Sequence, residues 1–370
     1  PGIIFDSEGV SNYAKIQYNL IKDYPRSDKG RKYWDKIITE IKLNSKKKSK
    51  YDCIVGVSGG TDSSYLLHIA KKYNLNPLAI NLDNGWNSDI AVKNIKKITS
   101  KLNIDLETYV IDYEEIKDVI KTYMKASLPW IDGPTDQAIN ASLYKIARRE
   151  NIKYILTGSD FRSEGKQPSE WTHIDSKQLK YLHKKFGNRK LNSYPIETEI
   201  KSLYSSYILN IKKVFPFYYL EYDKQTAQKL LHDEYGWEYY GGHHHENIFT
   251  KWVIGYWLPE KFKIDKRLIT LSAQILSNQI SREHAMELLS EPSYSKDRII
   301  EDTNYIIKKL DLSKSEFNKI WNSPNKTFRD YPSYFPLFEK YSKYVIPIAS
   351  KISSTKPKTF YELEARKQIK

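Results

Sequence analysis

Cysteine is almost absent from this 370-residue chain, which contains Cys53 and no other. An internal disulfide is therefore impossible, and the disulfide frameworks that hold many small secreted domains together are excluded. The scarcity of cysteine fits a reducing compartment, and we expect the protein to act in the cytoplasm.

Long apolar runs are missing as well. No run approaches the roughly 20 residues that a membrane-spanning helix needs, and no secretory signal is visible. We therefore expect no membrane segment. Hydrophobic residues still make up 40% of the chain, which is typical of a globular protein rather than a disordered one.

Acidic residues are outnumbered, with 45 Asp and Glu against 60 Lys and Arg and a net charge of +15. Such a balance fits an anionic partner, which could be a nucleotide, a nucleic acid or an acidic protein. The lysines are spread over the whole chain, however, as they are on an ordinary solvated surface. The 30 tyrosines are spread in the same way. The composition therefore gives no support for nucleic-acid binding, and we do not expect it.

Short apolar runs alternate with helical patterns between residues 52 and 160. The run at 53–57 is apolar and β-branched, which indicates a buried strand, and further strands are predicted at 78–82, 106–111 and 154–156. Between them, Ala91, Ile95, Ile98 and Leu102 repeat with the period of a helix. This alternation predicts an α/β fold with a doubly wound parallel sheet.

The pattern divides the chain into three predicted parts. Residues 1–50 form an N-terminal extension, with an irregular start and then a charged helix near 32–43. Residues 51–222 form the α/β domain, which includes a loop-and-helix excursion at 161–205 and one more strand ending near 214–216. Residues 223–370 form a mostly helical region, in which Ser281 is expected to cap a helix over 282–289.

The loop Ser58-Gly59-Gly60-Thr61-Asp62-Ser63 follows the first strand and opens a helix. Its glycines allow backbone conformations closed to other residues, and its N–H groups, with the helix N-terminus, suit a phosphate. Ser58 and Ser63 add hydroxyl donors, and Asp62 suits Mg²⁺, which prefers carboxylate and phosphate oxygens. A plain turn with a serine cap is the alternative. The buried strand, the helix and the polar residues together favour an ATP site, although the ending of a Walker A loop is absent.

Two other segments come at the carboxyl ends of predicted strands, where parallel sheets bind ligands. Asp83 and Asn84 follow the second strand, and Gly158 and Asp160 follow the fourth. We expect Asp83, Asn84 and Gly158 to join the loop in binding ATP, and Asp62 and Asp160 to act in catalysis. A sharp loop with a helix-capping side chain is the alternative for each segment, and it stays open for Asp160.

The stretch SGGTDS resembles the SGGxDS signature of the PP-loop ATP pyrophosphatases, which have a Rossmann-like (HUP-type) α/β fold. Four longer stretches resemble the N-acetyl sugar amidotransferase family, with the PseA/WbpG-type enzymes of bacterial surface-polysaccharide synthesis. They are PGIIFDSEGV, YDCIVGVSGGTDSS, LDNGWNSDIAVKNI and GWEYYGGHHHENIFTKWVIGYWLPEKFKIDKR. The resemblance covers nearly the whole chain. It implies that ATP, with Mg²⁺, is split to AMP and pyrophosphate to activate the acetamido oxygen of a nucleotide-linked sugar. Ammonia would then give an acetamidino sugar for lipopolysaccharide, capsule or flagellin glycan.

The chain departs from that family pattern in its missing cysteines. Members carry one Cys-x-x-Cys pair where this chain has Ser11-Asn12-Tyr13-Ala14, and a second pair near residues 129–134. Both halves of a four-thiolate zinc site are missing together, so we expect structural zinc to be absent and place the chain in a divergent branch.

His243, His244 and His245 precede Glu246 in a run that suggests a metal site. Adjacent side chains cannot all face one ion, however, and the spacing of a helical His pair is absent. The run therefore predicts a polar turn, which the resemblance places near the sugar or nucleotide pocket.

The source of ammonia is not evident in the chain. A glutaminase needs a nucleophilic cysteine with a base, but Cys53 lies inside a predicted buried strand, where a thiol is inert. The resemblance implies two partners, a glutaminase and a cyclase-like barrel protein, similar to the subunits of imidazole glycerol phosphate synthase.

Two other functions compete with the amidotransferase. A tRNA-thiolating PP-loop enzyme would suit the basic charge, but such enzymes often need more cysteines than Cys53. A nucleotide-binding protein that has lost catalysis is the third possibility, against which the intact loop argues.

Overall fold

The computed structural model describes residues 2–45, 49–242, 245–292, 294–352 and 358–369. Its centre is a sheet of five parallel strands in the order β3-β2-β1-β4-β5. The strands are β1 (Cys53–Gly56), β2 (Pro77–Asp83), β3 (Leu106–Val110), β4 (Tyr154–Leu156) and β5 (Lys212–Val214). The predicted fold class is confirmed. Because the strand order reverses between β1 and β4, the sheet has its ligand-binding crevice at the carboxyl ends of these two strands.

Helices cover both faces of the sheet because the strands are apolar on both sides. On one face, Cys53 and Val55 of β1 pack with α2 (Asp28–Ser45), α3 (Thr61–Lys72), α4 (Asp89–Lys101) and α11 (Lys224–Tyr235). On the other face, Ile54 packs with α6 (Gly133–Arg149). The alternation along β1 thus places α3, which follows the glycine loop, against the sheet.

The rest of the described chain is helical. The helices not yet given are α1 (Asn12–Asp23), α5 (Tyr113–Lys125), α7 (Phe161–Glu164), α8 (Ser169–Thr172), α9 (Ser176–Phe186), α10 (Glu199–Leu203), α12 (Ile248–Trp252), α13 (Arg267–Leu276), α14 (Arg282–Ser290), α15 (Lys296–Lys309), α16 (Lys314–Trp321), α17 (Phe335–Ile352) and α18 (Lys358–Lys367). Short 3₁₀ or π segments are η1 (Tyr204–Ile208), η2 (Pro216–Tyr218), η3 (Val253–Phe262) and η4 (Phe328–Asp330). The helical region beyond residue 223 matches the prediction, including Ser281 as the cap of α14.

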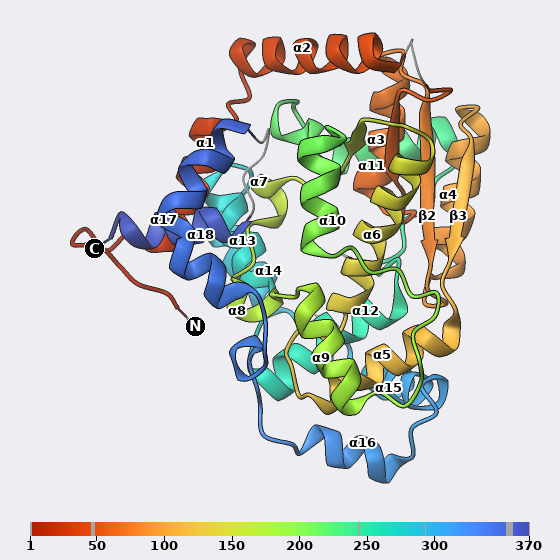
Figure 1. The fold of residues 1–370 in the computed structure, drawn as a ribbon, viewed down its shortest axis with the longest axis vertical. Coiled ribbons are helices and arrows are strands. Elements are labelled where there is room, and N and C mark those ends of the chain that lie inside the picture. The colour runs from red at the N-terminus through yellow and green to blue at the C-terminus, as the bar shows by residue number, and fades with distance from the viewer. Residues whose placement is uncertain (1, 46–48, 243–244, 293, 353–357, 370) are drawn as a thin grey trace.

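A second hydrophobic core lies beyond the carboxyl ends of the strands. Trp86 of the β2–α4 loop packs there with α5, α9, α12, η3, α15 and α16. Figure 1 shows these helices in the lower half of the molecule, below the sheet. Trp252 and Trp257 are fully buried in this core. The C-terminal region is therefore packed directly against the ligand-binding end of the α/β domain.

The irregular start predicted for the N-terminal extension is wrong over residues 12–23, which form α1. Ser11 caps this helix by accepting a hydrogen bond from the N–H of Ala14. The stretch 11–14, where the resembled family has a Cys-x-x-Cys pair, is therefore the start of a helix. Ile16 and Leu20, one turn apart, pack against Tyr361 near the C-terminus. The basic run at 46–50 lies partly outside the described residues, while Lys50 pairs with Asp105 at 2.7 Å.

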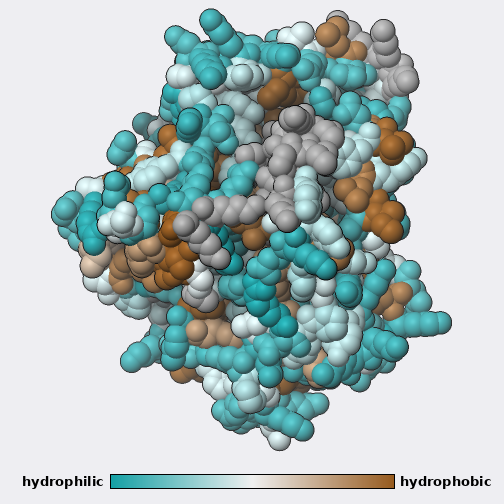
Figure 2. Space-filling view, turned by 60° about the vertical axis from the view of Figure 1, so that its left-hand side comes forward, coloured by the Kyte–Doolittle hydropathy of each residue, from teal (hydrophilic) through white to brown (hydrophobic). Residues whose placement is uncertain are grey.

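Polar residues dominate the surface. Figure 2 shows hydrophilic side chains over most of the face that carries α1 and α18, with separate apolar groups between them. The most exposed large apolar side chains of the described chain include Ile200 and Ile208 on α10 and η1, at 78% and 70%.

Candidate active site

The glycine loop between β1 and α3 has a backbone that only glycine can adopt. Gly59 has φ +80°, and a Cβ there would lie 2.3 Å from the carbonyl oxygen of Ala91. Gly60 is the N-cap of α3 and makes no side-chain capping hydrogen bond. The first N–H groups of α3 therefore point out of the helix without a local cap, as an anion site requires.

The hydroxyls of the loop are organised around this backbone. The N–H of Ser58 donates to Oγ of Ser63 at 3.2 Å, and the N–H of Gly60 donates to Oγ of Ser58 at 3.3 Å. The N–H of Thr61 donates to the hydroxyl of Tyr240 at 3.2 Å. These hydrogen bonds join the loop backbone, its two serines and Tyr240 into one polar cluster.

Gly158 lies against the start of α3. A Cβ on Gly158 would be 2.9 Å from the carbonyl oxygen of Asp62 and 3.2 Å from the nitrogen of Ser63. The β4–α7 loop can therefore approach the phosphate loop closely only because this residue is glycine. The structure brings Gly158 together with the loop, although contact with ATP itself stays a prediction.

Asp62 points from the first turn of α3 toward the segment after η2. Its Oδ1 accepts a hydrogen bond from the hydroxyl of Tyr222, and its Oδ2 lies 3.7 Å from Nζ of Lys224. Burial, and then the charge of Asp62, raise the pKa of Tyr222, so this phenol stays a hydrogen-bond donor. The carboxylate is one-quarter exposed, and its proposed role as a Mg²⁺ ligand stays a prediction.

Asp160 is more enclosed than the sequence indicates. Its side chain is only 1% exposed, pairs with Arg26 at 2.9 Å and caps α7 by accepting from the N–H of Arg162 at 3.2 Å. Burial raises its pKa, and the charge of Arg26 opposes that rise. These contacts are those of a residue that positions the β4–α7 loop, and the catalytic role stays a prediction.

Asp83 and Asn84 shape the loop after β2. Asp83 accepts a hydrogen bond from the N–H of Gly85 at 2.9 Å, and Asn84, which is buried, accepts from the N–H of Trp86 at 3.1 Å. Oδ1 of Asn84 also accepts from the amide of Asn247 at 3.4 Å. This loop is therefore fixed both by its own turns and by the C-terminal region.

Trp237, Tyr240 and Glu246 contact the phosphate loop. The resemblance placed the histidine run with Glu246 near the sugar or nucleotide pocket, but no sequence pattern assigned Trp237 or Tyr240 a contact there. Trp237 donates from Nε1 to the carbonyl oxygen of Gly59 at 3.0 Å, and Ser58 donates from Oγ to Glu246 at 3.4 Å. The backbone oxygen of Glu246 accepts from the N–H of Ser88 at 2.8 Å. The only sequence signal is the run of aromatic and glycine residues at 236–242.

The histidine run is described in part. His243 and His244 lie outside the described residues, while the N–H of His245 donates to the carbonyl oxygen of Gly242 at 3.3 Å in a turn. Over the described part of the chain, no group of three or more His, Cys, Asp or Glu could hold a metal ion. The predicted absence of structural zinc stays a prediction.

Three further lysines are half-buried: Lys166 after α7, Lys213 within β5 and Lys266 just before α13. Burial lowers the pKa of each. Nζ of Lys166 donates to the hydroxyl of Tyr218 at 2.6 Å, and Nζ of Lys213 donates to the amide oxygen of Asn140 at 3.2 Å. Nζ of Lys266 lies 4.0 Å from the ring centroid of Trp130. Sequence reasoning missed all three, because nothing local distinguishes them from surface lysines.

The parallel sheet and this loop together resemble the fold and loop of the ATP-using PP-loop enzymes. Residues 46–160 match the family model described as asparagine synthase, and residues 246–343 match the one described as LPS biosynthesis protein WbpG-like, C-terminal domain. The resemblance drawn from the sequence is confirmed in these two regions.

Similarity to individual proteins is more distant. An uncharacterized protein of Methanocaldococcus jannaschii is 29% identical to this chain. The matched region covers 38% of this chain and 49%, about half, of that relative. Among solved structures, NMN synthetase from Francisella tularensis is 14% identical over 56% of this chain and 93% of its own, with a TM-score of 0.30. NH3-dependent NAD synthetase from Campylobacter jejuni is 14% identical, and the match covers 80% of this chain and 98% of that protein, with a TM-score of 0.30. U34-tRNA thiolase from Methanococcus maripaludis is 14% identical, and the match covers 68% of this chain and 82% of that protein, with a TM-score of 0.33.

Among the described residues, none of the helices combines the length and the apolar character that crossing a bilayer requires.

Proposed function

We propose that this protein is an ATP-dependent amidotransferase that converts the acetamido group of a nucleotide-linked sugar into an acetamidino group, for the synthesis of a bacterial surface polysaccharide. One observation carries the proposal. The WbpG-like region begins at Glu246, whose side chain accepts a hydrogen bond from Ser58 of the phosphate loop. This contact supports one site that is shared by the phosphate loop and the region that resembles a polysaccharide-synthesis protein.

The proposed reaction has two balanced steps. First, the amide oxygen of the sugar attacks the α phosphorus of ATP, the bond to the β phosphate breaks, and pyrophosphate leaves. Ammonia then adds to the activated carbon, AMP leaves with the former amide oxygen, and a proton is released to give the amidine. An amidine is much more basic than an amide, so the product gains a positive charge.

The chain supplies binding, orientation and charge stabilisation. The N–H groups at the start of α3 and the hydroxyls of Ser58 and Ser63 are placed to hold the leaving pyrophosphate. Mg²⁺, when bound, would neutralise phosphate charge, with Asp62 as the carboxylate that the loop itself carries. Lys166, Lys213 and Lys266 are the cations available for the phosphates of the nucleotide-linked sugar.

Ammonia must come from outside the chain in this proposal. Cys53 is fully buried in β1, and burial raises the pKa of its thiol well above the usual range. It therefore cannot serve as the nucleophile of a glutaminase. A separate glutaminase, with a cyclase-like barrel protein as the second partner, would deliver the ammonia, and free ammonium would replace both in a test.

The products of ATP cleavage test the proposal. Purified protein is incubated with ATP, Mg²⁺, ammonium and UDP- or CMP-linked acetamido sugars. AMP and pyrophosphate should appear together only when the sugar is present, and the sugar should lose an oxygen and gain an NH group by mass spectrometry. ADP and phosphate as products would refute the mechanism. AMP formed only with tRNA and a sulfur donor would favour a thiolase, and ATP binding without any cleavage would favour a protein that has lost catalysis.

A further inference from the structure

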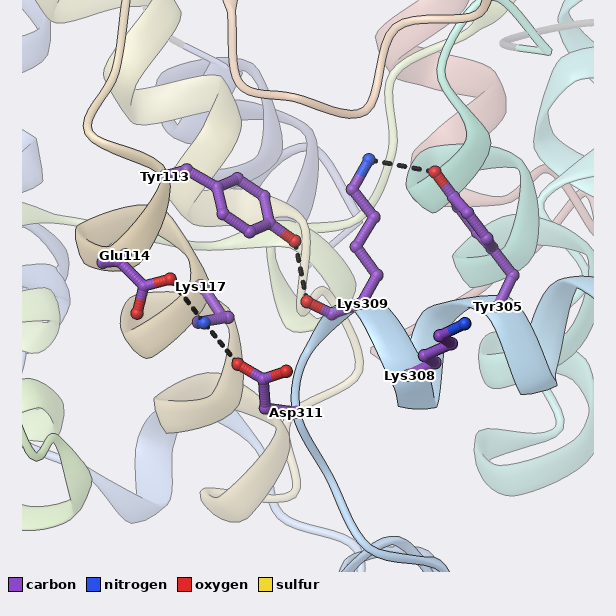
Figure 3. Close-up of a pocket in the computed structure, with 7 residues that line it drawn as sticks. All are labelled: Tyr113, Glu114, Lys117, Tyr305, Lys308, Lys309 and Asp311. Carbon is purple, nitrogen blue, oxygen red and sulfur yellow. Dashed lines mark hydrogen bonds and ion pairs between the residues drawn. The ribbon is translucent and has the colours of Figure 1, made fainter.

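A second pocket lies away from the phosphate loop, between the start of α5 and the end of α15. It has a volume of about 460 Å³, which falls within the range of small-molecule sites. Its lining residues are Tyr113, Glu114, Lys117, Tyr305, Lys308, Lys309 and Asp311 (Figure 3). Two helices and the turn after α15 thus form its walls.

The charges of this pocket leave a positive surplus. Lys117 is buried and pairs with both acids, at 2.6 Å from Glu114 and 2.5 Å from Asp311. Lys308 and Lys309 have no ion pair with any carboxylate in the part of the chain that the structure describes, and Lys308 is exposed at the rim. Two ammonium groups are therefore available to an anion.

Aromatic rings stand beside one of these ammonium groups. Nζ of Lys309 donates to the hydroxyl of Tyr305 at 3.0 Å, and the hydroxyl of Tyr113 donates to the carbonyl oxygen of Lys309 at 2.8 Å. Figure 3 shows the two tyrosines on either side of Lys309. A cation flanked by two rings suits a ligand in which a phosphate is attached to a sugar or base ring.

We propose that this pocket binds a small phosphorylated ring compound, a nucleotide or a sugar phosphate, with its phosphate held by Lys308 and Lys309. The site is separate from the phosphate loop and goes beyond the proposed function. It is joined to the ATP site by one contact, because Nζ of Lys309 also donates to the carbonyl oxygen of Gly85, in the loop that carries Asp83 and Asn84. A phosphate on Lys309 competes for this donor, and so couples the pocket to the ATP site.

Calorimetric titration of the full chain tests the site. The probes are UMP, glucose 1-phosphate and inorganic phosphate, each added without ATP, because a saturating nucleotide analogue would itself compete for a site proposed to bind nucleotides. We expect the two ring-bearing probes to bind, and Lys308→Met and Lys309→Met each to weaken binding by about tenfold or more, as loss of a charge-assisted contact does. Lys296→Met, an exposed lysine at the other end of α15, is the matched control and should change nothing.

Each result decides one part of the proposal. Lys308 is exposed and holds no partner within the described chain, so Lys308→Met folds normally and separates lost binding from lost structure. No binding of any probe at millimolar concentration, or binding equal in wild type and both variants, overturns the site. Binding of glucose 1-phosphate that is lost in Gly59→Ala but kept in Lys308→Met would place the probe at the phosphate loop and overturn the separateness of the site. Inorganic phosphate binding as tightly as the other probes overturns the role of the rings.

Discussion

At Gly59 a single added carbon atom decides whether the phosphate loop can form. Its φ of +80° is nearly the same as the +78° of Gly9, but a Cβ on Gly59 would meet the backbone of Ala91, whereas one on Gly9 meets nothing within 4 Å. The left-handed backbone costs both alanine variants about 1–2 kcal/mol. We expect Gly59→Ala to unfold at a clearly lower temperature than Gly9→Ala and to lose ATP binding. Equal melting temperatures for the two variants would show that the clash at Ala91 is unimportant.

Asp62 allows the charge beside the loop to be removed without changing the packing. Asparagine keeps the shape and the oxygen that accepts from Tyr222, so we expect Asp62→Asn to fold and melt like the wild type. Its pyrophosphate release from ATP should fall by at least about 100-fold, the usual effect of losing a transition-state electrostatic contact. Asp297→Asn is the matched control, because Asp297 is also the second residue of its helix, α15. Turnover within a few-fold of wild type in Asp62→Asn would remove Asp62 from the mechanism.

Sequence could identify the loop residues but not all their neighbours. The glycines and Ser58 were predictable because a phosphate site needs local backbone freedom and local donors. Trp237 and Glu246 were not, since their contacts with Gly59 and Ser58 join positions about 180 residues apart. Asp160 lies where the prediction puts it, yet its buried pair with Arg26 depends on a tertiary contact that no local pattern shows.

The contact between α3 and α11 gives the protein a pH-dependent element. Nδ1 of His68 on α3 lies 2.7 Å from the hydroxyl of Tyr235 at the end of α11. Burial, and then the nearby Lys72, lower the pKa of His68 below its usual 6.5. The unfolded chain therefore binds this proton more readily than the folded chain, so the stabilisation is complete above pH 6.5 and is lost as the pH falls toward the lowered value.

We expect the free energy of unfolding to decrease between pH 7.5 and pH 5.5, and His68→Gln to make that decrease smaller. Denaturant titrations at the two pH values measure the difference. His232→Gln, on the same α11 but exposed, should leave the pH dependence as it is in the wild type. A pH dependence that His68→Gln does not alter would assign the effect to other groups.

Elements were predictable where a hydrophobic pattern was strong. The first four strands and the helices between them follow from apolar runs and helical patterns. The part before β5 was predicted only as a loop-and-helix excursion, followed by a strand that ends near 214–216. Helix α1 was missed, although Ser11 and the pair Ile16 and Leu20 carry a helix signal, because its few apolar residues are mixed with polar ones. Its burial comes from packing against Phe161 and Tyr361, which are distant in sequence.

Across the whole molecule, the cores cross the boundaries that the sequence predicts between its three parts. The second core contains Trp86 and α5 from the α/β domain together with Trp252 and Trp257 from the C-terminal region. The smaller core at the N-terminus joins Ile16 to Tyr361. Each predicted part therefore depends on the others to cover large apolar surfaces.

This arrangement predicts one cooperative unfolding transition for the whole chain. Separating the C-terminal region would expose the buried rings of Trp252 and Trp257, and burying a large apolar side chain contributes about 1.5–3 kcal/mol each. Scanning calorimetry should show a single peak whose calorimetric and van't Hoff enthalpies agree. A fragment of residues 223–370 expressed alone should lack the near-UV signal of packed tryptophans. Two separated calorimetric peaks, or a fragment that unfolds cooperatively by itself, would mean that the C-terminal region folds independently and that its contacts with the phosphate loop form only after folding.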